Sequence, residues 1–379
     1  MPIKKKVLLI GSIPPPVHGS NVYFNSLLNS KIRDEFEIAH LDISDHRDLS
    51  NLSKLDFTNV TLALRNLREL YKKLKEFRPD LVYIPVASNF LPYLRDGLFI
   101  LFSGYFSNSK IIIHSHEGDN FRNGFYKDSL FPVKYFIKKS LSKADTAIVL
   151  GEGLRFVFKD FVRNIEIIPN GITPEKNKTA VRDITKNKTT KNVKIGFMGN
   201  LFESKGVTDV VNAAVTVLKK HSTAEFIIAG AAPSKEHSAK EEIEKIVKEN
   251  NLEEKIIFTG VITGEKKEEF FNKTDIFVFP SYYKYEGFPL VLLSAMSAAV
   301  PVISVKNTGA ISDIVTDNET GILTERKNPG KLSEAMNYLI ENPDVRIEMG
   351  KKGKEKFEKN FTLDININKM IRVFNKVLN

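Results

Sequence analysis

The sequence predicts an α/β protein built from two doubly wound parallel sheets. Short apolar runs alternate with longer segments of helical periodicity along nearly the whole chain, and strands separated by helices are typical of parallel sheets. The same scheme is repeated in the second half of the chain. A length of 379 residues exceeds what one ordinary core covers, so we expect two domains.

The first half begins with an expected strand at residues 7–10. A loop rich in proline and glycine follows and ends at Gly19. We then expect helices at residues 21–28, 62–77, 91–106 and 130–143, and strands at residues 81–84, 110–113, 146–150 and 165–168. No internal repeat beyond this alternation is evident.

The second half alternates in the same way. Strands are expected at residues 193–199, 225–230, 255–259, 275–281 and 302–305, and helices at residues 207–220, 239–250 and 291–300. The tail, residues 332–379, is helical by its pattern.

The positive charge of the chain is unevenly placed. The net charge is +10, and residues 176–194 alone carry seven basic residues against one acidic residue. This polar stretch predicts a solvated linker, which we place at residues 176–192, between the two domains. It contains no aromatic residue, so it does not resemble a nucleic-acid surface, and we expect no nucleic-acid partner.

Other bulk features indicate the compartment. The chain has no cysteine, which excludes disulfides and thiolate metal sites and is consistent with a reducing cytoplasm. The apolar run after residues 4–6 ends at Gly11, so we interpret it as a first strand and not as a signal peptide. The later apolar run at residues 98–106 is far too short to span a membrane. We expect a cytoplasmic protein that at most lies on the inner face of the membrane.

A carboxylate stands between a buried strand and an apolar helix. Glu286 follows the expected strand at 275–281 and precedes the helix at 291–300, which Pro301 ends. Such a loop lies at the carboxyl edge of a parallel sheet, where helix N-termini stabilise anionic phosphates. The alternative is a capped core helix with an incidental carboxylate.

The sequence of this segment resembles the donor site of family 4 of the retaining glycosyltransferases. Those enzymes have the GT-B fold, in which two Rossmann-like domains face each other across a cleft. The matching residues are Glu286, Gly287, Phe288, Ala295, Met296, Pro301, Val302 and Ile303. The resemblance implies an acceptor-side domain at residues 1–175, joined by a C-terminal helix at about 362–379, and a donor-side domain at residues 193–361.

The resemblance also assigns roles to the residues that would bind the donor. Glu286 would hold a hydroxyl of the donor sugar, and Lys205, ahead of the helix at 207–220, would bind the diphosphate. Gly19 would let the backbone approach the donor closely. The remaining donor contacts would come from the segment Gly287, Phe288, Pro289 and Leu290, in which proline has no amide to offer.

Two positions depart from the family pattern. Ser294 stands where the family has a second glutamate, which holds the ribose, and Asn200 stands where the family usually has arginine. An amide cannot neutralise a diphosphate, so the leaving group would depend more on Lys205. Because Glu286 and Ser294 are about two helical turns apart, we expect one helix to present both to the ligand.

Two histidines follow the expected strand at 110–113. His114 and His116 alternate along the chain, so they point to the same side. The resemblance gives His116 a hydrogen-bonding role over the donor sugar, and we expect His114 to pack beside it. No acidic or cysteine motif completes a set of metal ligands, so we expect neither histidine to bind a metal.

The resemblance implies a metal-independent retaining hexosyltransferase. Glu286, His116 and Lys205 are the expected catalytic residues, because glycosyl transfer needs a preorganised cation and an oriented sugar. The co-substrate would be a nucleotide-diphosphate sugar, and we expect no further cofactor. The chain also lacks an Asp-x-Asp motif, which disfavours a metal-dependent transferase.

The acceptor is less well defined. We expect a glycan or glycolipid in envelope polysaccharide assembly, with peripheral contact to the membrane. The helix at residues 64–78 is basic and amphipathic, which fits an anionic membrane surface, although a core-facing helix with a solvated back has the same pattern. Residues 134–143 add further basic charge.

Two other classes of function remain open. A GT-B protein with weakened catalysis, acting as a binding or scaffolding subunit, would explain Asn200 and Ser294. A nicotinamide dehydrogenase would share the Rossmann-like halves, but the first strand is not followed by a Gly-x-Gly-x-x-Gly motif.

Overall fold

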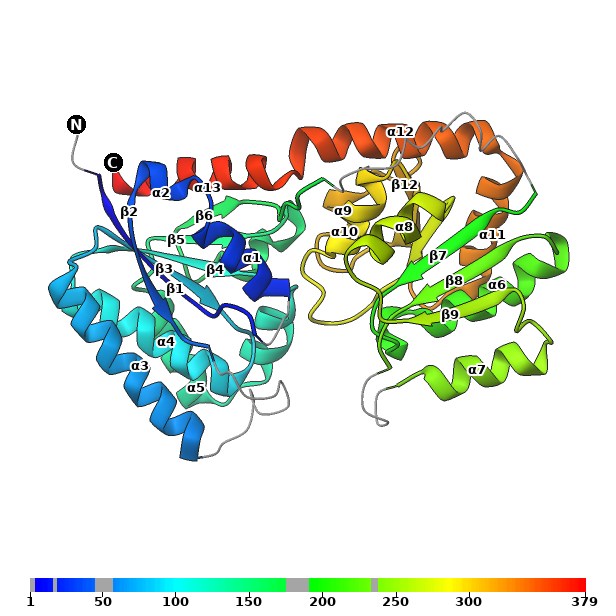
Figure 1. Cartoon of the computed structure of the whole chain (residues 1–379). Coiled ribbons are helices and arrows are strands. Elements are labelled where there is room, and N and C mark those ends of the chain that lie inside the picture. Colours follow the sequence, from blue (N-terminus) through cyan, green and yellow to red (C-terminus); the bar gives the residue numbers. More distant parts are fainter. Residues whose placement is uncertain (1–3, 16–18, 45–56, 175–190, 233–237) are drawn as a thin grey trace. The chain divides into compact units, whose positions relative to one another are not determined.

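The computed structural model describes residues 4–15, 19–44, 57–174, 191–232 and 238–379 (Figure 1). The chain divides into two compact units, Met1–Asn170 with Asp364–Asn379, and Gly171–Leu363. Each unit is built on a six-stranded parallel sheet, which confirms the prediction of two doubly wound α/β domains. The proposed linker lies outside the described residues except for its last two positions.

The first sheet has the strand order β2-β1-β3-β4-β5-β6. Successive strands run to one side of β1 and then to the other, so the winding reverses between β1 and β3. Ligands bind at such a reversal in open α/β sheets, beyond the carboxyl ends of the strands. The strands are β1 Lys6–Gly11, β2 Glu37–Asp42, β3 Leu81–Val86, β4 Lys110–Ser115, β5 Thr146–Val149 and β6 Asn164–Ile167.

Helices cover both faces of the first sheet (Figure 1). On one face lie α3 Phe57–Glu76, α4 Phe90–Phe106 and α5 Phe131–Leu141; on the other lie α1 Gly19–Leu28 and α13 Leu363–Leu378. The short helix α2 Ile32–Glu35 and the turns η2 Phe121–Tyr126 and η3 Glu152–Val157 complete the unit.

The last helix of the chain belongs to the first unit. The Tyr23 hydroxyl donates to Asn366 Oδ1 over 3.1 Å, and the rings of Tyr83 and Phe374 are 5.9 Å apart. Phe374 is completely buried, so α13 forms part of the first core.

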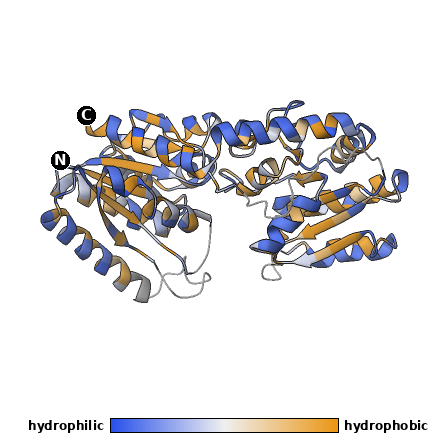
Figure 2. Ribbon diagram, turned by 45° about the horizontal axis from the view of Figure 1, so that its top comes forward, coloured by the Kyte–Doolittle hydropathy of each residue, from blue (hydrophilic) through white to orange (hydrophobic). Residues whose placement is uncertain are grey.

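The second sheet has the strand order β12-β11-β10-β7-β8-β9, and its winding reverses between β7 and β10. Figure 2 shows that the strands of both sheets are mainly hydrophobic, as expected for strands covered on both faces. The strands are β7 Lys194–Met198, β8 Glu225–Ala229, β9 Ile256–Gly260, β10 Ile276–Phe279, β11 Val302–Val305 and β12 Gly321–Thr324.

The helices of the second unit also lie on both faces of their sheet (Figure 1). The helix α6 packs against α7 and α11, and α9 packs against α12. They are α6 Val207–Lys220, α7 Lys240–Glu249, α8 Glu265–Lys273, α9 Leu290–Ser297, α10 Ile311–Ile314, α11 Pro329–Glu341 and α12 Pro343–Asn360. None of the helices described in either unit is both long and apolar enough to cross a bilayer.

Several elements are absent from the sequence-based prediction. The strands β2 and β12 are the edge strands of their sheets, and β2 is mostly half-buried or exposed, so its sequence lacks a continuous apolar run. The helix α8 is largely charged and buries only Phe270 and Phe271. The helices α2 and α10 have four residues each, too few for a periodic pattern.

The helix after Glu286 is shorter than expected. It begins at Leu290 and ends at Ser297, and Ala299 adopts a left-handed conformation with φ of 55°. Glu286 lies in the loop before this helix. The expectation that one helix carries both Glu286 and Ser294 is therefore wrong.

Candidate functional site

The reversal point of the second sheet carries a buried ion pair. Lys205 follows β7 and Glu286 follows β10, and their Nζ and Oε2 atoms are 2.7 Å apart. Only 15% of the lysine side chain and 10% of the glutamate side chain are exposed. Ser281 Oγ donates a second hydrogen bond of 2.7 Å to the same carboxylate oxygen. We call Lys205, Ser281 and Glu286 the switch-point cluster.

A tight turn holds Lys205 at the mouth of α6. The turn Glu203–Lys205 (η5) ends at Gly206, which has φ of 77° and precedes the helix. A Cβ atom at Gly206 would lie 2.5 Å from the carbonyl oxygen of Pro280, so only glycine lets the two loops approach this closely. The Lys205 ammonium also lies 4.5 Å from the centre of the Tyr283 ring. A cation fixed at a helix N-terminus is suited to bind phosphate.

The backbone around Gly309 and Ala310 packs against the loop that carries Glu286. The amide of Ala310 donates to the Gly287 carbonyl over 2.8 Å. A Cβ atom at Gly309, where φ is 48°, would lie 2.0 Å from the Glu286 carbonyl oxygen. Phe288 is buried and packs its ring edge-on against Phe361 at 5.7 Å. Backbone contacts and packing therefore orient the carboxylate before any ligand binds.

The other expected donor contacts differ in their accessibility. Gly287 and Pro289 are buried, and Pro289 and Leu290 mark the start of α9, where helix amides have no partner within the helix. Asn200 is exposed at the end of β7.

Ser294 is buried within α9. It is 1% exposed, and its Oγ has no hydrogen-bond partner among the described residues. Buried hydroxyls normally have a partner, so either a ligand supplies one or the site tolerates the loss for the sake of close packing.

The reversal point of the first sheet holds a separate cavity. Its volume is about 280 Å³, and it is lined by residues that follow the carboxyl ends of the first four strands, together with residues of α1 and α4. The polar lining residues used below are Arg95, Asp96, His116 and Glu117. Gly19, the other expected site residue of this unit, is exposed at the start of α1.

The two histidines lie side by side next to this cavity. Their ring centroids are 4.0 Å apart, and His114 Nδ1 is 2.7 Å from the Tyr83 hydroxyl. His116 lines the cavity, and both of its ring nitrogens lack a partner among the described residues. Burial lowers the pKa of His116 to about 4. His116 is therefore a neutral hydrogen-bonding group at neutral pH.

Two acidic side chains share the cavity with His116. Asp96 accepts hydrogen bonds from Arg95 Nε and Nη2 and from the Ala87 amide. Burial raises the pKa of Asp96, although Arg95 opposes the shift. Burial, and then the charge of Asp96, raise the pKa of Glu117 to about 7, and its Oε2 has no partner among the described residues. The cavity thus offers unpaired hydrogen-bonding groups to a polar ligand.

Four of these groups were not predicted from the sequence. Ser281 stands at the end of the apolar run at 275–281, directly after Pro280. Tyr283 belongs to an aromatic pair ahead of Glu286. Glu117 directly follows His116 and could have been found from its place at the carboxyl end of a strand. Asp96 gave no signal, because it is one acidic residue within a hydrophobic helical segment.

Within the described part of the chain, no three His, Asp or Glu side chains are grouped closely enough to hold a metal ion. The positive charge of the switch-point cluster comes from Lys205.

The sequence of the chain is similar to those of known glycosyltransferases. Residues 178–356 match the family model described as glycosyl transferases group 1. A poly(ribitol-phosphate) alpha-N-acetylglucosaminyltransferase of Staphylococcus aureus is 27% identical over 267 residues, which cover 70% of this chain and 50% of that protein. The chain thus spans about half the length of that relative.

Solved structures share the fold over nearly the whole chain. A glycosyltransferase from Rickettsia africae is 16% identical and superimposes with a TM-score of 0.76, covering 99% of both chains. The Anabaena HepE protein, solved in complex with UDP-glucose, is 15% identical with a TM-score of 0.71, covering 98% of this chain and 99% of that one. These likenesses show the GT-B type of fold. Together with the family match over residues 178–356, they make this chain similar to the glycosyl transferases of group 1.

Proposed function

We propose that the protein is a retaining glycosyltransferase that moves a sugar from a nucleotide-diphosphate sugar to an acceptor hydroxyl. The observation that carries the proposal is the switch-point cluster, in which Lys205 and Glu286 meet at 2.7 Å beyond the ends of β7 and β10. A fixed ammonium and a fixed carboxylate side by side can hold a diphosphate and a sugar hydroxyl respectively.

In this proposal Lys205 stabilises the departing diphosphate. Negative charge develops on the diphosphate while positive charge develops on the sugar ring, and a preorganised cation is worth more in a buried site than in water. The amides at the start of α9 and the N-terminus of α6 support the same charge. With a lysine in this role, we propose that the reaction needs no metal ion.

Glu286 and His116 orient the sugar. Glu286 has one carboxylate oxygen occupied by Lys205 and Ser281, so its second oxygen is available to accept a hydrogen bond from a sugar hydroxyl. His116 belongs to the first unit, where it lines the cavity and can bond to a hydroxyl of the sugar. Because His116 is neutral, it acts through hydrogen bonds and not through charge.

We assign the acceptor to the cavity of the first unit. Glu117, Asp96 and His116 offer hydrogen-bonding groups to hydroxyls, and the pair of acidic groups disfavours an anionic group at the same depth. The relative from Staphylococcus aureus is named for a poly(ribitol-phosphate) acceptor. That name supports an acceptor among hydroxyl-rich envelope polymers or glycolipids.

The donor proposal is tested by turnover. Purified protein is incubated with a panel of UDP-, GDP- and ADP-sugars, and release of the nucleoside diphosphate is measured with and without an added glycan acceptor. Release that requires Lys205 supports the proposal. Nucleotide-sugar binding without any release would instead favour the binding or scaffolding subunit, which the buried Ser294 and the uncharged Asn200 make the second candidate.

A further inference from the structure

The N-terminal part of α5 exposes several large apolar side chains. Leu130, Phe131 and Tyr135 are 77%, 79% and 60% exposed. Leu130 and Phe131 are the two most exposed large hydrophobic residues among those described. Side chains of this size are normally buried at least in part, and a contiguous exposed set marks an interaction surface.

The rest of α5 shows that this exposure is not a packing defect. Ile137, Ser140 and Leu141 are buried and fix one side of the helix onto the unit. Phe131 and Tyr135 are four residues apart and therefore lie on one face of the helix, the face turned away from the core. The helix is thus well packed on one side and apolar on part of the other.

Lysines border the apolar residues. Lys134, Lys138 and Lys139 follow Phe131 by three, seven and eight residues, and α5 contains no acidic residue. The Lys134 ammonium lies 5.8 Å from the centre of the Tyr126 ring. The exposed acidic residue nearest in sequence is Asp128. We call Leu130, Phe131, Lys134, Tyr135, Lys138 and Lys139 the α5 patch.

The basic amphipathic helix α3, for which the sequence left a membrane contact and a core-facing role open, packs on the core through part of its apolar side. In α3, Leu70 and Leu74 are buried in the core, while Leu64 and Tyr71 are 62% and 43% exposed. Its basic residues form the solvated back of an ordinary core-facing helix. The α5 patch is more exposed than this helix, because Leu130 and Phe131 are 77% and 79% exposed against 62% for Leu64.

We propose that the α5 patch docks the first unit on an anionic lipid surface. The apolar tip would enter the boundary between headgroups and acyl chains, while the lysines extend to lipid phosphates, as long cationic side chains do at this boundary. Two copies of this chain meeting through the same patch would place lysine against lysine, which opposes a dimer. Charge complementarity therefore selects an anionic bilayer over a second copy of the chain.

The inference adds to the proposed function and does not depend on it, because vesicle binding is measured without any sugar substrate. Failure of vesicle binding leaves the turnover assay untouched, and failure of turnover leaves the vesicle assay untouched.

The experiment is co-sedimentation of the full chain with vesicles. One set contains phosphatidylcholine mixed with phosphatidylglycerol, and the other contains phosphatidylcholine alone. We expect binding to the anionic vesicles only, and a sharp loss between about 0.1 M and about 1 M salt, where the Debye length falls from roughly 10 Å to roughly 3 Å.

Two variants separate the apolar and the basic parts of the patch. Leu130→Ser with Phe131→Ser should lower the partition constant at least about tenfold, because the inserted apolar area is lost. Replacing Lys134, Lys138 and Lys139 by Gln should lower it by about fivefold per charge. Both sets of changes lie on exposed or half-exposed positions, so circular dichroism and the melting temperature should stay unchanged.

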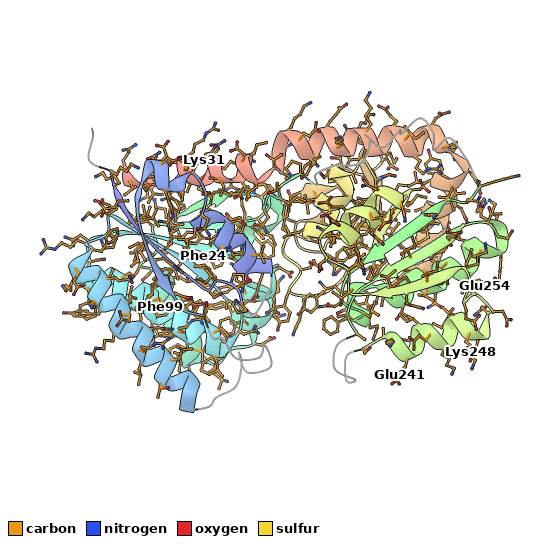
Figure 3. The ribbon with its side chains drawn as sticks, in the orientation of Figure 1. Phe24, Lys31, Phe99, Glu241, Lys248 and Glu254 are labelled. Atoms are coloured by element: carbon orange, nitrogen blue, oxygen red, sulfur yellow. The ribbon has the colours of Figure 1, made fainter. Side chains whose placement is uncertain are left out.

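Matched controls come from the second unit. Val261→Ser with Tyr338→Ser removes exposed apolar area elsewhere, and Lys245→Gln with Lys248→Gln removes charge from α7, whose Lys248 points into solvent (Figure 3). Both controls should bind like the wild type. Equal binding to neutral and anionic vesicles, unchanged binding by both patch variants, or a dimer that dissociates in the Leu130/Phe131 variant without any vesicle binding would overturn the proposal.

Discussion

The ammonium of Lys205 and the carboxylate of Glu286 form a buried ion pair of 2.7 Å at the reversal point of the second sheet. The two residues are 81 positions apart in the sequence and reach each other from the ends of two adjacent parallel strands. Because Lys205 and Glu286 pair with each other, a substitution at either position leaves the charge of the other without this partner.

Removal of either partner should reduce glycosyl transfer. Lys205→Ala and Glu286→Ala should each lower turnover about tenfold to a thousandfold, the range for a single electrostatic contact in a buried site. Because each change leaves the other charge buried and unpaired, both variants should also lose a few kcal/mol of stability, roughly 3.

The double variant separates the two effects. Lys205→Ala with Glu286→Ala leaves no unpaired charge, so it should recover stability relative to either single variant without recovering turnover. Chemical denaturation and the nucleotide-sugar assay on the same preparations measure both quantities. Near-wild-type turnover in all three variants would remove the donor-site assignment.

His116 should affect the chemical step more than donor binding. His116→Ala should lower kcat more than it raises KM for the donor, because the sugar is no longer oriented at the reacting carbon. Steady-state kinetics with varied donor test this. The account also predicts that a chelator has no effect, so activity that disappears on chelation and returns with manganese or zinc would refute the metal-free assignment.

Glu117 should make the stability of the protein depend on pH. Its folded pKa is raised to about 7 from an ordinary value of 4.5, mainly by burial. Between these values the folded state binds more protons than the unfolded state, so this group makes the protein less stable as pH rises from about 4.5 to about 7. Arg95 and Asp96 line the same cavity, and the charge of Asp96 adds to the rise in the pKa of Glu117.

The variant Glu117→Gln should remove that pH dependence. Above pH 7 it should be more stable than the wild type by at most about 3 kcal/mol, and below pH 4.5 the difference should vanish. Melting curves across this pH range test the sign. Glu254→Gln, at an exposed position of the second unit (Figure 3), is the control and should leave the profile unchanged.

Ser294 distinguishes a ribose contact from a packing residue. If its unpartnered Oγ meets a ribose hydroxyl, Ser294→Glu should strengthen nucleotide binding by roughly 1–3 kcal/mol, and Ser294→Ala should weaken it. If Ser294 is small only to let α9 pack, the glutamate should lower the melting temperature without a gain in affinity. Calorimetric titration with melting curves separates these outcomes, and weaker binding in a destabilised Ser294→Glu would show that the ribose lies elsewhere.

The sequence predicted the fold well because its central strands are continuous apolar runs. The strands β1, β10 and β11 are buried on both faces. Their sequences are therefore short continuous apolar segments, which are easily recognised as strands. The edge strand β2 escaped prediction because solvent on one side permits Glu37, His40 and Asp42 within it. Burial, not intrinsic strand preference, made the difference.

The candidate site was predicted only in part. Lys205 and Glu286 were identified separately, yet their direct contact depends on the close approach of two loops at Gly206 and Pro280, which no local pattern encodes. The acidic cavity of the first unit was missed for the same reason, because Asp96 and Glu117 come from different elements. The exposure of Leu130 and Phe131 could not be predicted either. An apolar helix start has the same sequence pattern whether another element packs on it or solvent surrounds it.

The most direct test of the central claim is calorimetric titration of UDP, GDP and ADP into the wild type, Lys205→Ala and the exposed-lysine control Lys248→Ala. The account predicts that the wild type and the control bind at least one of these diphosphates equally well, and that Lys205→Ala binds it at least about tenfold more weakly, because one charge-assisted contact to the diphosphate is lost. Equal affinity in all three proteins, or no binding to any of them, would contradict the assignment of the switch-point cluster to the donor.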